Sequence, residues 1–189
     1  MSDARLFIEQ PLDLETLAAA AHDDERQTAQ SFGTQQRQKE YLMWRFIVRR
    51  ELGRDTLITY SANHKPLIVN KNINIGVAHS DRHAAVVMSS QPCADDIEPL
   101  SRDFSRAASR FMSQQERMLS DDPRLQAAVW CAKETLYKYD GNGGLDFIED
   151  LHVTEVDFGT MQVTGYIRRQ GPVVMHMVQH DGDLVVYVG

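Results

Sequence analysis

Residues 122–144, DPRLQAAVWCAKETLYKYDGNGG, encode the helix around which the second half of the chain is expected to fold. Asp122 followed by Pro123 predicts a helix start, because proline is favoured at the first helical position. A glycine-rich run at residues 141–144 predicts its end. The apolar residues between them form one continuous stripe, which predicts a face buried in a core. They are Leu125, Ala128, Val129, Ala132 and Leu136.

Four stretches after this helix have the composition of β-strands. The turn Asp181, Gly182, Asp183 separates the last two of them and predicts an antiparallel meander. The four stretches are residues 151–157, 161–168, 173–179 and 184–188.

The residues that precede the helix predict two further helical segments. Within residues 102–112 apolar side chains recur at i, i+3, i+4 and i+7, the pattern of a helix with one buried face. They are Phe104, Ala107, Ala108 and Phe111. Ser113, followed three residues later by Glu116, predicts a capping box at the start of a short next helix.

The first half of the chain also combines helices and strands. Residues 14–21 predict a short helix capped by Asp13, and residues 34–52 predict a longer helix that ends at Gly53. The apolar stripe of the longer helix contains Tyr41, Trp44 and Val48, and its other faces are basic, with Arg45 and Arg49 one turn apart. After this helix the apolar period changes from about 3.6 to about 2. The predicted strands are residues 56–60, 66–69, 72–78 and 84–89.

These elements predict an α+β fold with two similar lobes, each with helices packed on an antiparallel sheet. We expect an N-terminal lobe over residues 1–93 and a C-terminal lobe over residues 94–189. A chain of 189 residues that is 42% hydrophobic and 25% charged can bury a sizeable core. Cys93 and Cys131 are too few and too far apart to predict a disulfide framework, so we expect both to be small core residues.

Charge is unevenly distributed along the chain. The 20 Lys and Arg residues and 27 Asp and Glu residues give a formal net charge of −7, yet residues 1–90 hold 11 of each kind. Residues 26–71 carry nine basic side chains and three acidic ones, which favours an anionic ligand for this half. The acidic total argues against nucleic acid as a partner, because affinity for a phosphate backbone needs many cationic side chains on one surface.

Neither a membrane span nor a signal peptide is evident in the sequence. No apolar run approaches the roughly 20 residues of a membrane-spanning helix. The N-terminus lacks the basic-then-apolar pattern of a signal peptide. We therefore expect no membrane partner, a cytoplasmic location and a monomer.

Asp96 and Glu98, separated by Ile97, are the first candidate site residues. If this stretch is extended, residues two apart lie on the same face, so both carboxylates would converge while Ile97 packs inward. Mg²⁺ is commonly held by a few carboxylates together with substrate phosphates. The alternative is a solvated strand edge.

The helix segment that carries Glu134 and Lys138 is the second candidate. It also contains Trp130, Lys133 and Tyr137, all of which are expected to lie away from the apolar stripe. Glu134 and Lys138 are four residues apart and share a face. They predict either an exposed ion pair, or a carboxylate that helps to hold a metal beside an ammonium that neutralises a phosphate leaving group.

His79, at the end of an apolar strand, and Lys65, before Pro66, are weaker candidates. A histidine at a strand end is commonly a hydrogen-bonded structural residue, and a basic helix is commonly a solvated face. The excess positive charge of residues 26–71 makes an anionic ligand the alternative for both.

In their order along the chain these features resemble the 4'-phosphopantetheinyl transferase superfamily, in particular its single-chain pseudo-dimeric, surfactin-synthetase-activating type. The similarity covers roughly residues 30–145. Its most specific part is the W-x-x-K-E-x-x-x-K element of residues 130–138, and the D-I-E of residues 96–98 supports it. The other matching residues are Glu40, Tyr41, Leu42, Arg45, Lys65, Pro66, His79, Ser80, Phe111, Ser113 and Glu116.

The resemblance implies transfer of the 4'-phosphopantetheine group of coenzyme A to a serine of an acyl or peptidyl carrier protein, with release of adenosine 3',5'-bisphosphate. It implies that Asp96, Glu98 and Glu134 hold Mg²⁺, or Mn²⁺, on the pyrophosphate. Glu134 would also take the serine proton, and Lys138 would offset charge on the departing phosphate. The implied partners of the coenzyme A phosphates are Arg37, Lys39, Lys65 and His79.

The sequence departs from the family pattern at two places. Ala78 precedes His79 where the family usually has serine, and Ala94 and Asp95 precede Asp96 where a glycine and an aliphatic residue are usual. Strand alternation would turn Asp95 inward, where an unpaired carboxylate is costly. Either a bulge re-aims Asp95, or a basic side chain lies near it, or it joins the metal site.

Two other functions compete with the transferase. A degenerate relative would bind coenzyme A or a carrier domain without catalysis, and Ala78 and Asp95 motivate this alternative. A metal-dependent phosphodiesterase or nuclease would use the same acidic residues, but the acidic second half of the chain argues against a nucleic-acid substrate.

Overall fold

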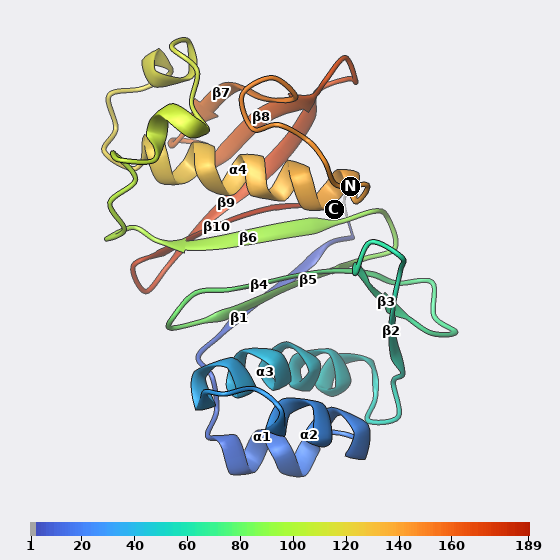
Figure 1. Ribbon diagram of the computed structural model, residues 1–189. Coiled ribbons are helices and arrows are strands. Elements are labelled where there is room, and N and C mark those ends of the chain that lie inside the picture. Colours follow the sequence, from blue (N-terminus) through green and yellow to red (C-terminus); the bar gives the residue numbers. More distant parts are fainter. Residues whose placement is uncertain (1–2) are drawn as a thin grey trace.

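The computed structural model describes residues 3–189 and has an α+β fold, as predicted (Figure 1). Its helices are α1 Leu14–Ala20, α2 Asp23–Gln30, α3 Gln35–Leu52 and α4 Leu125–Asp140, with two single 3-10 turns, η1 Ala108–Arg110 and η2 Glu116–Met118. Its strands are β1 Arg5–Glu9, β2 Ile58–Tyr60, β3 Pro66–Ile68, β4 Asn74–His79, β5 Ala84–Ser89, β6 Ala94–Pro99, β7 Leu151–Asp157, β8 Gln162–Ile167, β9 Val173–His180 and β10 Asp183–Val188.

The N-terminal part is a three-stranded antiparallel sheet with helices on one face (Figure 1). Its strand order is β1-β5-β4, and β2 and β3 form a separate hairpin beside it. Helix α3 lies against the sheet through Met43, Ile47 and Val48, which are completely buried, and α1 and α2 pack on α3. The Asp13 carboxylate accepts a hydrogen bond of 2.8 Å from the Thr16 backbone N–H, which caps α1 as predicted.

The C-terminal part is a five-stranded antiparallel sheet of order β6-β10-β9-β8-β7, with α4 across one face (Figure 1). Strands β7 to β10 follow one another in space as in sequence, which confirms the predicted meander. Asp181 and Gly182 have φ of 44° and 82°, the left-handed pair that closes a two-residue hairpin. The predicted stripe of α4 is buried, including Ala128, Val129 and Leu136.

The two sheets meet face to face where β6 crosses β4 and β5 (Figure 1). Ile97 and Val185 of the five-stranded sheet pack on Ala78 and Ala85 of the three-stranded sheet, and all four are buried. Strand β6 therefore turns Ile97 toward the other sheet, as predicted, while the alternate residues Asp96 and Glu98 point the other way.

The predicted helix over residues 102–112 is wrong, since only η1 is helical within that range. The Asp103 carboxylate accepts the backbone N–H of Ser105 at 2.9 Å, a local bond that competes with a helix. Phe104 and Phe111 are buried nevertheless, and their ring centroids lie 6.2 and 5.1 Å from that of Trp130. The helical spacing belongs to a loop that packs its aromatic rings on α4.

Strand β1 and helix α2 are present in the structure but were not predicted. β1 pairs with β5 at the edge of its sheet and has no fully buried residue, so it lacks a strict alternation. α2 has the sequence DDERQTAQ, with only Glu25 and Ala29 buried, so it lacks an apolar stripe.

Two basic side chains of α3, Arg45 and Arg49, are internal rather than part of a solvated face, whereas Arg37 and Arg50 of the same helix are exposed. Glu25 of α2 accepts hydrogen bonds of 2.5 and 2.8 Å from Arg49, and its carboxylate lies 3.2 Å from Nε of Arg45. All three side chains are more than nine-tenths buried. The pKa of Arg45 is lowered by burial, although Tyr60, Tyr41 and Glu25 partly offset it. These two arginines hold α2 on α3.

Cys93 and Cys131 are free and buried, as predicted for small core residues. Across residues 3–189, none of the helices has both the length and the apolar composition needed to cross a bilayer.

Candidate functional site

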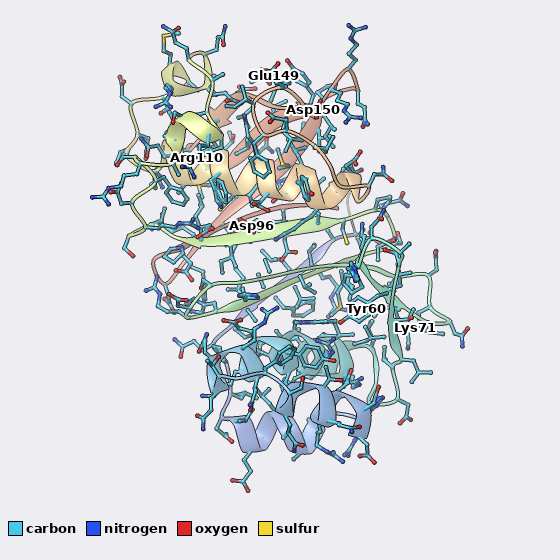
Figure 2. The ribbon with its side chains drawn as sticks, in the orientation of Figure 1. Tyr60, Lys71, Asp96, Arg110, Glu149 and Asp150 are labelled. Carbon is cyan, nitrogen blue, oxygen red and sulfur yellow. The ribbon has the colours of Figure 1, made fainter. Side chains whose placement is uncertain are left out.

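A cavity of about 480 Å³ opens between α3, the ends of β4 and β6, and α4. It is lined by Arg37, Glu40, Tyr41, Trp44, Arg45, Tyr60, His64, Pro66, Val77, Ala78, His79, Asp96, Glu98, Trp130, Glu134 and Lys138. Figure 2 shows Asp96 on β6, between α4 and the N-terminal sheet. Both parts of the chain therefore contribute to one cavity, and six of the predicted site residues lie in it.

Asp96 and Lys138 form the central contact of the cavity. Lys138 Nζ donates to Oδ1 of Asp96 at 2.8 Å and to the backbone oxygen of Asp95 at 2.9 Å. Burial lowers the pKa of Lys138, but Asp96 and Asp95 more than offset it, so that the net pKa is raised. The other oxygen of Asp96, Oδ2, is buried and accepts no hydrogen bond from residues 3–189.

Glu98 is held in place by two side chains. Trp130 Nε1 donates to Oε1 of Glu98 at 2.8 Å, and Arg102 forms an ion pair with the same oxygen. The hydrogen bond from Trp130 thus links the first half of α4 to the end of β6. The ring of Trp130 also packs on Phe104 and Phe111.

Glu134 is half-buried on α4 and faces this pair of acids. Its pKa is raised, first because burial penalises the carboxylate and next because Asp96 repels it, although Lys138 partly opposes both effects. A carboxyl group whose pKa is raised toward neutrality is a stronger base than an ordinary glutamate.

Arg37, beside His79, makes a cationic corner of the same cavity. Arg37 Nη1 lies 3.4 Å from His79 Nε2, and Glu40 lies 3.1 Å from Arg37 and 3.7 Å from His79. Arg37 is mostly exposed, and His79 ends β4 with 42% of its side chain accessible. The contacts of Arg37 with Glu40 and His79 both use Nη1, so its other N–H groups can donate to an anion.

Lys65 and Lys39 are placed differently from the other predicted residues. Lys65 lines an adjoining cavity of about 310 Å³, whose walls include Ile75, Val77 and Lys138. The two cavities share His64, Pro66, Val77 and Lys138 in their walls, so they lie side by side. Lys39 lies on α3 outside the lining of either cavity.

Lys133, which was expected away from the core, is completely buried. Its Nζ donates to Glu116 at 2.9 Å and to the backbone oxygen of Phe147 at 2.7 Å. Glu116 also accepts the backbone N–H groups of Ser113 and Val153 at 2.7 and 2.9 Å. The predicted capping box is thereby confirmed, because Ser113 Oγ accepts the Glu116 N–H at 3.2 Å. Lys133 and Glu116 are structural.

A family model described as the 4'-phosphopantetheinyl transferase superfamily matches residues 93–188. The chain belongs to this superfamily. The matched segment contains Asp96, Glu98, Glu134 and Lys138 and ends before Gly189. No curated protein sequence matches the chain.

The chemistry of the donors fits a divalent cation, as the superfamily membership leads one to expect. Asp96, Glu98 and Glu134 line one cavity, and the repulsion of Glu134 by Asp96 and Glu98 is the kind that a cation relieves. The buried, unpartnered Oδ2 of Asp96 provides a lone pair for it. The three carboxylates are not a tight cluster, since within residues 3–189 they do not all lie within 4.8 Å of one another.

Asp95 lies apart from this acid group. It is completely buried on the side of β6 that faces Gly76, and no hydrogen bond from the described residues reaches either of its carboxylate oxygens. β6 pairs with β10 in unbroken register, so no bulge re-aims it. Burial raises the pKa of Asp95 to about 8, although Lys138 opposes the effect. The buried carboxyl is thus accommodated by protonation.

Sequence reasoning did not find Arg102 or Trp130 as supports of Glu98. Arg102 follows Glu98 by four residues, but the two lie at a strand end and in a turn rather than on one helix. Trp130 was predicted to lie on the helix that carries Glu134 and Lys138, but its hydrogen bond to Glu98 joins positions 32 residues apart. No local pattern predicts such a contact.

Proposed function

We propose that this phosphopantetheinyl transferase superfamily member transfers the 4'-phosphopantetheine group of coenzyme A to a serine of an acyl or peptidyl carrier protein. The observation that supports it best is the shared cavity, where the acids of β6 and α4 face the cationic corner made by Arg37 beside His79. Transfer of this kind needs positioning and charge neutralisation more than covalent catalysis.

Glu134 is the proposed general base. In this step the serine Oγ forms a bond to the β-phosphorus of coenzyme A, the bond from that phosphorus to the departing phosphate breaks, and the serine proton goes to Glu134. The products are the holo carrier protein and adenosine 3',5'-bisphosphate. Glu134 is half-buried in the cavity beside Asp96 and Lys138, where a bound serine hydroxyl could reach it.

Lys138 and the acids have complementary tasks. Asp96, Glu98 and Glu134 are the residues that would hold Mg²⁺, or Mn²⁺, and the cation would supply charge neutralisation on the pyrophosphate. Lys138, fixed by Asp96 at 2.8 Å, is proposed to offset the charge that develops on the departing phosphate.

The N-terminal residues are proposed to bind coenzyme A. Arg37 and His79 are placed to contact one of its phosphates, and Lys65 is placed to contact another from the adjoining cavity. We retain Lys39 as a predicted contact of weaker support, since it lies outside both cavities. We propose that the lobe of residues 1–93 binds coenzyme A and that the lobe of residues 94–189 supplies Asp96, Glu98 and Glu134, as in a pseudo-dimer.

A relative that binds coenzyme A without turnover is the competing proposal. It is favoured by the spacing of the three carboxylates, which among the described residues do not form a compact ligand set. The transferase proposal requires them to close on coenzyme A and a cation.

Intact-mass analysis distinguishes the two. Apo forms of an acyl and a peptidyl carrier protein are incubated with this protein, coenzyme A and Mg²⁺, with a carrier whose serine is replaced by alanine as the control. We expect the mass of one phosphopantetheinyl group on the native carriers and none on the control. No mass gain on any carrier, while coenzyme A still binds by calorimetry, refutes the transferase and supports the non-catalytic relative.

A further inference from the structure

Two hairpin turns from different sheets meet beside the cavity (Figure 1). The turn after β4 contains Ser80 and leads to His83, and the turn after β9 contains Asp181 and Gly182 and leads to Asp183. The contacts between them join residues about a hundred positions apart in the chain. The cluster follows the end of β4, directly after His79, and lies at the start of β10; it shares none of its members with the acids of the cavity.

Asp183 organises this cluster. It is completely buried, and its Oδ2 accepts Ser80 Oγ at 2.5 Å and lies 2.9 Å from Nδ1 of His83. Its Oδ1 is paired with Arg82. Asp183 accepts hydrogen bonds from Ser80 and Arg82 as well, so Nδ1 of His83 is the donor in its contact with Oδ2.

In the neutral ring, a proton on Nδ1 leaves Nε2 of His83 with a lone pair. His83 is 1% exposed, and Nε2 has no hydrogen-bond partner among residues 3–189. A buried imidazole nitrogen without a partner costs free energy comparable to a lost hydrogen bond. A histidine whose other nitrogen donates to a carboxylate is the arrangement that orients metal-ligating imidazoles.

His180 and Asp181 lie close to the ring of His83. One ligand atom from each of His83, His180 and Asp181 lies within 4.8 Å of the others. The rings of His83 and His180 are 5.1 Å apart and nearly perpendicular. His180 and Asp181 are 41% and 68% exposed, so their side chains are free to move toward the buried ring.

We propose that His83, His180 and Asp181 bind a Zn²⁺ ion, with water completing a tetrahedral shell. Two imidazoles and one carboxylate are a donor set that Zn²⁺ favours, whereas Mg²⁺ and Ca²⁺ favour oxygen ligands. Ligand atoms around tetrahedral zinc are about 3.3 Å apart, so the exposed pair has to close on His83 by little more than an ångström. The ion would tie a turn of one sheet to a turn of the other.

The charge at the site is compatible with a cation. Arg82 is the one basic side chain bonded to the cluster among the described residues, and the Oδ1 of Asp183 neutralises it. The carboxylate of Asp181 is the anionic ligand that would face the ion. Asp183 holds His83 from behind and is a positioning residue.

The test measures zinc binding directly, with activity left aside. The protein is stripped of metal, placed in excess Mg²⁺ to occupy other carboxylates, and titrated with Zn²⁺ by equilibrium dialysis with elemental analysis. Co²⁺ in place of Zn²⁺ reports the geometry, because a tetrahedral site gives intense visible absorption. We expect one tight Zn²⁺ per chain, and a Zn²⁺-dependent rise of the melting temperature.

Two surface variants and one control decide the result. His180→Asn and Asp181→Asn are expected to weaken Zn²⁺ binding at least about tenfold and to remove the thermal shift. His176→Asn, on the same strand but against Tyr187, is the matched control and should bind as the unmodified protein does. Equal zinc affinity in the double variant His180→Asn and Asp181→Asn, or no tight zinc in the unmodified protein, overturns the proposal.

Discussion

Lys138 Nζ lies 2.8 Å from Oδ1 of Asp96, on a strand 42 residues away in sequence, rather than in a simple ion pair with Glu134 one helical turn before it. The contact fastens the end of α4 to β6. Because Lys138 bonds to Asp96, it makes no hydrogen bond to Glu134. The pKa of Glu134, which is repelled by Asp96, is raised. Glu134 and Lys138 of α4 are therefore proposed to have separate roles, Glu134 as the base and Lys138 as the cation beside the departing phosphate.

Glu134→Gln is expected to lower kcat by about 10²- to 10⁴-fold, since it removes the base but keeps the shape of the side chain. Transfer rates by mass spectrometry check it. Glu149→Gln, on an exposed loop, is the control (Figure 2). Full activity of Glu134→Gln contradicts the base role.

Lys138→Gln is expected to lower kcat about 10²-fold or more, because the departing phosphate loses its cation. Removal of the ammonium also frees Oδ1 of Asp96, so the Mg²⁺ concentration for half-maximal rate should not rise. A full Mg²⁺ titration at saturating coenzyme A separates the two quantities. A variant that regains the original kcat at high Mg²⁺ would show that Lys138 serves metal binding instead.

Arg37→Ala is expected to raise KM for coenzyme A about tenfold with little change in kcat, because one charge-assisted hydrogen bond is lost. His79→Ala should behave likewise, since the two side chains are 3.4 Å apart, and the double variant should cost less than the sum. Arg110→Ala, at an exposed arginine that does not line the cavity, is the control (Figure 2). Additive effects of Arg37→Ala and His79→Ala contradict a shared phosphate site.

Lys133→Met is expected to destabilise the fold by about 3–5 kcal/mol, because it leaves the buried Glu116 without its cation. Urea unfolding followed by circular dichroism gives the free energy of unfolding. Arg168→Gln, which removes an exposed partner of Asp150, should change it by about 0.5 kcal/mol or less. A loss below about 1 kcal/mol for Lys133→Met would show that Glu116 is satisfied by its backbone donors alone.

Asp95 predicts a pH-dependent stability. Its folded pKa of about 8 exceeds its unfolded value, so the folded state binds more protons between about pH 4 and pH 8. The free energy of unfolding should therefore fall as pH rises through this window, by up to about 1.4 kcal/mol per pH unit from this group, and level off above it. Asp95→Asn should remove this slope and be more stable than the unmodified protein at pH 7. Unfolding measured in a chelator checks it, and an unchanged slope contradicts it.

Local patterns account for most of the secondary structure. The stripe of α4, the cap of α1 and the turn at Asp181 and Gly182 each depend on residues within a few positions of one another, so the sequence suffices. The predictions for residues 102–112 and for α2 failed because the contacts that decide those segments are not local. Residues 102–112 carry helical spacing without a helix, and α2 forms on α3 through the buried pair Glu25 and Arg49, which no helical periodicity reveals.

By itself, the sequence determined the α+β class, the order of the motif residues and the position of each on a helix or strand, because those depend on periodicity and spacing. Only the tertiary structure decided which side chains meet. It turned Lys133 into the core, paired Lys138 with Asp96, buried Asp95 as a carboxyl of raised pKa, and brought His83 against His180. These contacts join residues far apart in the chain, and they are selected by the packing of two sheets rather than by any local preference.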